Sequence, residues 1–141
     1  MKKKISETLR FILLLLFIYT AYHKLIDLNH FESTLMKSTL IEGYQIKYLL
    51  YFVPIIEIVT ILFLIQKKYL IGLYLSFFLM LTFTIYLVVL NNFSFYKGCS
   101  CGGIFNELSY SEHVVVNISL VLISLISIII YEEITITAKT Y

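Results

Sequence analysis

Charged residues are scarce in this chain. Aspartate, glutamate, lysine and arginine make up 14% of its 141 residues, against about 25% in soluble globular domains. Hydrophobic residues make up 60%, and the mean hydropathy is +0.89. This balance excludes a soluble enzyme or a nucleic-acid-binding domain, and it indicates an integral membrane protein in contact with lipid.

Cysteine is scarce as well, since Cys99 and Cys101 are the only two, and both lie in the stretch YKGCSCGG. A tetrahedral metal site needs four ligands, and this chain has no second cysteine pair to supply them. The two cysteines and His113 make only three clear ligands, with Glu112 as an uncertain fourth, so we expect no metal. A disulfide across Cys-x-Cys closes a very small ring, which makes it strained and easily reduced. The spacing favours a redox pair, with a metal site or purely structural cysteines as the alternatives.

Four long apolar segments predict an all-α membrane protein built as a four-helix bundle. They cover about 9–28, 46–65, 69–90 and 110–131, and each is long enough to cross about 30 Å of hydrocarbon. Backbone amides in lipid must be satisfied within their own segment, so all four should be helices. We expect residues 1–141 to form a single integral membrane domain. The start MKKKISETLR resembles a signal peptide, but no small-x-small cleavage site follows, so we expect an uncleaved first helix.

The positions of the positive charges predict how the chain is oriented. Cytoplasmic loops are enriched in lysine and arginine, so we place both termini in the cytoplasm and both long loops outside. The cations then divide into an inner set of Lys2, Lys3, Lys4, Arg10, Lys67, Lys68 and Lys139 and a smaller outer set of Lys24, Lys37, Lys47 and Lys97. The cysteines are therefore expected on the extracytoplasmic side, where disulfides form and persist.

The two outer loops have different patterns. In the first, Leu28, Phe31, Leu35 and Leu40 recur at the spacing of an amphipathic helix lying on the membrane face. The second, 91–113, holds the Cys-x-Cys pair and ends in a stretch that predicts a start signal for the fourth span. There, Ser109 and Glu112 have the spacing of a helix capping box. That box would fix His113 in the first turn near the cysteines, where it could take or give the proton that thiol exchange requires.

Glu57 is the polar residue of the second span that most needs an explanation. A charge near the centre of a span costs about 2.5 to 3.5 kcal/mol on insertion scales, so Glu57 should face the bundle interior. There it could relay protons or hydrogen-bond a quinone, or it could simply bridge helices. At the end of the first span, Lys24 and Asp27 are spaced i to i+3, and we expect them to pair with each other.

The fourth span carries a polar stripe. At 100° per residue, His113, Asn117, Ser124 and Ser127 fall on one face, which should point into the bundle. For the two serines we expect hydrogen bonds to neighbouring helices. For Asn117, together with Glu57, we predict contact with a bound cofactor.

Three stretches of the chain resemble one known family. HKLIDLNHFESTL after the first span, VPIIEI in the second and GCSCGGIFNELSYSEHVVVN before the fourth are similar to the MauE branch of the DoxX-like membrane proteins. The resemblance covers about 24–120, and Cys-x-Cys followed by Glu-His-x-x-x-Asn is its most specific part. Many members have phenylalanine after the second cysteine, whereas this chain has Gly102.

The resemblance implies a redox-associated protein of the bacterial inner membrane. It implies thiol-disulfide exchange through Cys99 and Cys101 with a thioredoxin-like carrier or an extracytoplasmic client protein, and a membrane quinone as the electron acceptor. Such a protein would be a thiol-disulfide oxidoreductase. The alternative is a non-enzymatic membrane subunit or assembly factor of a larger complex, in which the cysteines fix the outer loop.

Overall fold

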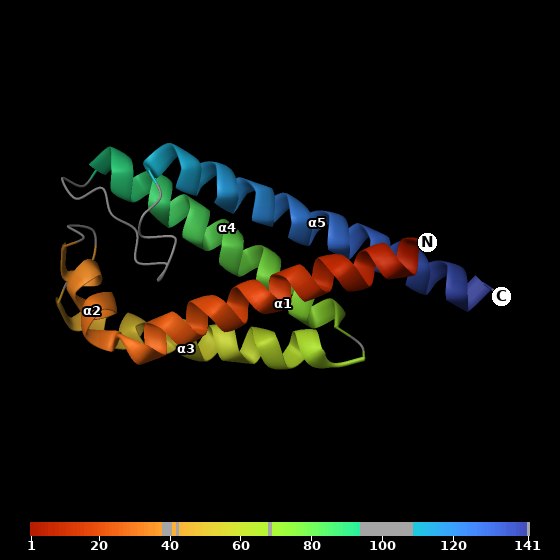
Figure 1. Cartoon of the computed structure of the whole chain (residues 1–141), viewed down its shortest axis with the longest axis horizontal. Helices are drawn as coiled ribbons and strands as arrows, with labels where there is room; N and C mark the ends of the chain where they lie inside the picture. Colours follow the sequence, from red (N-terminus) through yellow and green to blue (C-terminus); the bar gives the residue numbers. More distant parts are fainter. Residues whose placement is uncertain (38–40, 42, 68, 94–108, 141) are drawn as a thin grey trace.

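The computed structural model describes residues 1–37, 41, 43–67, 69–93 and 109–140, and 94% of these residues are helical. Within these ranges the chain forms α1 (Lys2–Ile26), α2 (Leu28–Lys37), α3 (Gly43–Ile65), α4 (Leu70–Phe93) and α5 (Tyr110–Thr140), with no strand (Figure 1). The predicted all-α fold is confirmed.

The four predicted spans are α1, α3, α4 and α5, each long and apolar enough to cross a membrane. The chain is therefore a multi-pass membrane protein. All four run further than predicted at one end. The longest extensions are those of α1, which begins at Lys2, and α5, which continues to Thr140. The extensions are polar, and lysine and glutamate propagate a helix well where water can solvate their charges.

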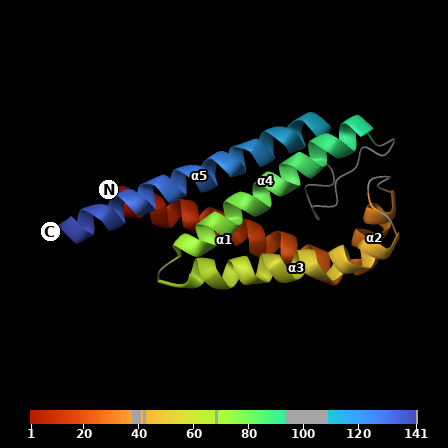
Figure 2. The same ribbon diagram turned by 180° about the vertical axis from the view of Figure 1, so that it is seen from behind.

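The four long helices form a ring in which each packs against two others. Helix α1 contacts α3 and α5, and α4 contacts the same two helices. Figures 1 and 2 show both termini at one end of this bundle, with α2 at the opposite end. Each helix buries only a narrow stripe, and the outward faces carry large apolar side chains such as Phe11, Phe52 and Phe78, each more than half exposed. In a membrane these faces contact lipid.

The buried stripes contain small hydroxyl side chains that let the helices approach closely. Thr60, Ser76, Ser124 and Ser127 are all fully buried. The expected hydrogen bonds from the two α5 serines to neighbouring helices are not formed. Ser124 Oγ instead donates to the carbonyl of Val121 at 2.8 Å, and Ser127 Oγ donates to a carbonyl of its own helix at 2.7 Å. A hydroxyl three or four residues after a carbonyl reaches it without any partner helix.

Gly72, near the start of α4, lies where α4 approaches the backbone of α3 closely. A Cβ built there would lie 2.7 Å from the backbone nitrogen of Leu64 in α3. An added methyl group would overlap that backbone, so a side chain at this position requires α3 and α4 to move apart. Glycine is therefore required where α3 turns back into α4.

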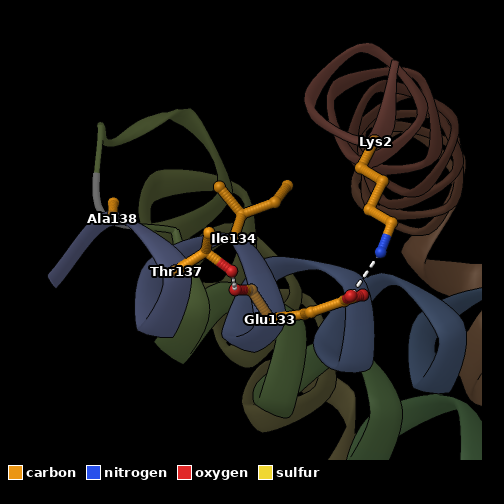
Figure 3. Close-up of a pocket in the computed structure, with 5 residues that line it drawn as sticks. All are labelled: Lys2, Glu133, Ile134, Thr137 and Ala138. Atoms are coloured by element: carbon orange, nitrogen blue, oxygen red, sulfur yellow. Dashed lines mark hydrogen bonds and ion pairs between the residues drawn. The ribbon is translucent and has the colours of Figure 1, made fainter. Parts of the chain in front are cut away.

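Polar contacts join α1 to its neighbours at the end that carries both termini. Figure 3 shows Lys2 of α1 reaching Glu133 of α5, with which it forms an exposed ion pair. One turn deeper, Ser6 hydrogen-bonds the hydroxyl of Tyr69 at 3.0 Å, and the Arg10 guanidinium lies 4.4 Å from the centre of the same ring. These contacts tie α1 to α5 and to the start of α4.

Helix α2 confirms the predicted amphipathic helix. Phe31 and Leu35 are buried against Ile46 and Leu50 of α3, whereas Leu40, the last residue of the predicted pattern, lies outside the described residues. The helix covers one end of the bundle, beside α3 (Figure 2).

The predicted pairing of Lys24 with Asp27 is wrong. The Asp27 carboxylate accepts a hydrogen bond from the backbone N–H of His30 at 2.9 Å and so caps the first turn of α2. With Asp27 engaged there, the lysine side chain points into the bundle and meets a different carboxylate.

Candidate functional site

Lys24 of α1 forms an ion pair and hydrogen bond with Glu57 of α3, through its Nζ and Glu57 Oε1. Their side chains are 4% and 0% exposed. Each residue falls on the buried stripe of its helix, one turn after Thr20 in α1 and after Pro54 in α3. The predicted inward orientation of Glu57 is confirmed. Two opposite charges tolerate this depth because each reduces the desolvation cost of the other.

Aromatic rings surround the same ammonium group. Lys24 Nζ lies 5.0 Å from the centre of the Phe83 ring in α4 and 5.8 Å from that of Phe31 in α2. Both distances are within the range in which the negative face of a ring attracts a cation. Four helices, α1, α2, α3 and α4, thus meet at one lysine.

A cavity of about 210 Å³ opens beside this lysine, between α2, α3 and α4. Apart from Lys24, its walls are almost entirely apolar, and four aromatic side chains contribute to them: Phe31, Phe52, Phe83 and Tyr86. An apolar pocket with one well-placed polar group is the usual form of a small-molecule site.

The two predicted cofactor-binding residues, Glu57 and Asn117, do not line this cavity. Asn117 of α5 is 3% exposed and borders a second space of only about 20 Å³, which Phe83 separates from the first. Within the described part of the chain, its amide nitrogen has no hydrogen-bond partner. Glu57 reaches the larger cavity only through Lys24, so the structure does not bring the two predicted residues to one ligand space.

The start of α5 has the predicted capping box. The Ser109 N–H donates to Glu112 Oε2 at 2.9 Å, and the Glu112 N–H approaches Ser109 Oγ at 3.5 Å. The box holds His113 in the first turn, where the His113 N–H donates to the Ser109 carbonyl at 3.0 Å. The His113 side chain is 3% exposed, so it faces the bundle interior.

Cys99 and Cys101 lie outside the described residues, and so does the predicted proximity of His113 to them. The helices on either side do fix where their segment enters and leaves the bundle. Helix α4 ends at Phe93 and α5 begins at Tyr110, and both of these ends lie at the α2 end of the bundle (Figures 1 and 2). Lys24, in the last turn of α1, belongs to the same end.

Sequence reasoning missed Lys24 as a site residue. It sought the partner of this lysine within its own helix, where Asp27 offers a favourable spacing. A more general signal was present, because a lysine in a span needs a counter-ion and Glu57 is the only acidic residue in the second predicted span. Only the packing of α1 against α3 turns that signal into a contact.

Comparison with known proteins identifies a family. The family model described as Methylamine utilisation protein MauE matches residues 2–130, which include α1 to α4, both cysteines and most of α5. No curated protein and no solved structure matches the chain.

Proposed function

This chain belongs to the MauE family, and on that premise we propose that it is a thiol-disulfide redox protein of the bacterial inner membrane. Electrons pass from an extracytoplasmic client protein, or from a thioredoxin-like carrier, through Cys99 and Cys101 to a membrane quinone. Both termini are cytoplasmic and the cysteine pair is extracytoplasmic, in agreement with the excess of positive charge near the termini and in the α3–α4 turn.

The exchange takes place in two steps. A thiolate of the client attacks the Cys99–Cys101 disulfide, and the second client thiol resolves the mixed disulfide, leaving an oxidised client and two reduced cysteines. The two cysteines then give two electrons and two protons to the quinone, which becomes a quinol, and their disulfide forms again. His113 serves as the proton acceptor and donor for the thiols.

Support for this function comes from the buried Lys24–Glu57 pair. A quinone that takes up two electrons also takes up two protons, so its site needs ionisable groups inside an otherwise apolar bundle. Intramembrane charges are costly and commonly mark proton or ligand pathways. Lys24 of this pair lies in the last turn of α1, at the end of the bundle where α4 ends and α5 begins (Figure 1).

The experiment that tests this function replaces Cys99 and Cys101 by serine, singly and together, in the bacterium that naturally makes the protein. Gel-shift alkylation then measures the redox state of extracytoplasmic proteins. We expect reduced clients to accumulate in all three variants, because one thiol alone cannot form the disulfide. Ser100→Ala is the matched control, since it changes the residue between the cysteines and leaves both thiols. A single-cysteine variant should also trap a client as a mixed disulfide, which mass spectrometry identifies.

The same variants separate this function from a role in assembly. Client disulfides that stay fully formed in the double serine variant would refute thiol-disulfide exchange. If a membrane complex were lost at the same time, the chain would be a non-enzymatic subunit or assembly factor, which its family membership also fits.

A further inference from the structure

We infer that the cavity between α2, α3 and α4 binds the ring of a lipid-soluble quinone, with a ring carbonyl accepting a hydrogen bond from Lys24. This inference rests on the proposed function, in which a quinone is the electron acceptor, and it deepens that function by naming the site where the quinone binds. It transfers the cofactor contact predicted for Glu57 and Asn117 to Lys24 and to the aromatic walls of the larger cavity. The binding itself can be measured without any redox step.

The walls of the cavity favour a flat, apolar molecule. Phe31, Phe52, Phe83 and Tyr86 contribute aromatic side chains, and the remaining walls are mainly aliphatic. Rings prefer stacked or edge-to-face contacts with other rings, which adds to the free energy of burying apolar area. A flat ring therefore fits these walls better than a branched or strongly polar molecule does.

The charge beside the cavity favours a neutral ligand. Glu57 already neutralises the Lys24 ammonium, and both side chains are buried. A fatty-acid carboxylate or a lipid phosphate would bring a second negative charge into this low-dielectric site, at a large desolvation cost. Lysine has three N–H donors, and Glu57 Oε1 takes one of them. A neutral carbonyl can accept another without changing the net charge.

The size and the opening of the cavity agree with a ring that carries a long tail. Its volume of about 210 Å³ lies below the roughly 300 to 1,000 Å³ of pockets that enclose whole drug-sized ligands. The cavity holds a head group, and the tail must leave it. Phe52 forms part of the wall and is 60% exposed on the outer surface of α3, so the tail leaves past this residue into lipid.

Binding of decylubiquinone to the purified full-length protein in detergent tests the inference. We expect saturable binding by isothermal titration, and at least tenfold weaker binding in Val53→Phe, which fills the cavity from α3. Ile55→Phe is the matched control, because Ile55 is 56% exposed on the same helix and does not line the cavity. Its affinity should stay within twofold of the wild type. Leu79→Phe, from α4, provides a second filling variant in case Val53→Phe does not fold.

The double variant Lys24→Met/Glu57→Met tests the carbonyl contact, since it removes both charges and leaves neither of them unpaired. Decylubiquinone should bind it about tenfold more weakly or worse, because a charge-assisted hydrogen bond is lost. Dodecylbenzene, which has no carbonyl, should bind wild type and double variant equally. Equal loss for both probes, or no loss for either, would overturn the contact with Lys24.

A competition experiment distinguishes a quinone from a lipid. Oleate and phosphatidylglycerol should fail to displace decylubiquinone at equal concentration. Displacement by either lipid would overturn the inference. So would an affinity for decylubiquinone that equals that of the wild type in both Val53→Phe and Leu79→Phe. Quinone binding in the Cys99→Ser/Cys101→Ser variant should equal that of the wild type. If decylubiquinone binds normally but client disulfides stay fully formed in the double serine variant, only the proposed function is refuted. If decylubiquinone does not bind but reduced clients accumulate in that variant, only this inference is refuted.

Discussion

Removing one charge of the Lys24–Glu57 pair should destabilise the protein far more than removing one charge of the Lys2–Glu133 pair. Both pairs join a lysine of α1 to a glutamate of another helix, but the side chains of the first are 4% and 0% exposed and those of the second 62% and 53%. The chain thus contains a buried pair and an exposed pair of the same chemical type.

The expected magnitude follows from this difference in burial. Lys24→Met removes one partner of a buried ion pair and leaves the other, Glu57, in place, a change that costs about 3 to 5 kcal/mol. Lys2→Met removes an exposed pair that water and salt screen, so it should cost about 0 to 1 kcal/mol. At 1.4 kcal/mol per tenfold change, the buried substitution lowers the folded-to-unfolded ratio by at least about a hundredfold.

Unfolding by SDS in mixed micelles, followed by circular dichroism, measures both effects. The double variant Lys24→Met/Glu57→Met should recover stability to within about 1 kcal/mol of wild type, because uncharged side chains of similar volume replace a buried pair at little cost. Equal costs for Lys24→Met and Lys2→Met would refute the reasoning. So would a double variant that is less stable than either single one, since the charge left alone would then not be the cause.

Two further substitutions test local packing by the same unfolding assay. Gly72→Ala should cost about 1 to 3 kcal/mol, because its methyl group would overlap the backbone of Leu64; Gly43→Ala, with nothing within 4 Å, should change stability by less than about 0.5 kcal/mol. Ser109→Ala should cost about 0.5 to 2 kcal/mol through loss of the α5 cap, whereas the exposed Ser119→Ala should be nearly neutral. Either pair behaving alike would contradict the corresponding contact.

Local pattern was enough to predict much of the architecture. The lengths of the four apolar runs fixed the spans, and a spacing of three to four residues fixed the inner face of α2 and the polar stripe on α5. The capping box at Ser109 and Glu112 was predictable for the same reason, because its partners are three residues apart and one helical turn brings them together.

Partners from different helices could not be predicted in this way. Asp27 lies at a favourable spacing from Lys24, yet it caps α2, and the lysine pairs with a carboxylate 33 residues further along the chain. The prediction for the two α5 serines was wrong in the opposite direction. It expected partners on other helices, but their hydrogen bonds are made within α5. For Lys24 and Glu57, the positions and rotations of the helices decide which groups meet, and these depend on the packing of all four spans.

The amino-acid sequence by itself determined that this chain is a four-span membrane protein with one pair of cysteines between its last two spans. Hydrophobic length and backbone hydrogen bonding in lipid leave no other solution. Only the tertiary structure decided that Lys24 meets Glu57 and that an aromatic cavity opens beside them. That arrangement needs α1, α2, α3 and α4 to converge on one lysine. Such contacts depend on how the helices pack together, so the sequence of any one segment does not reveal them.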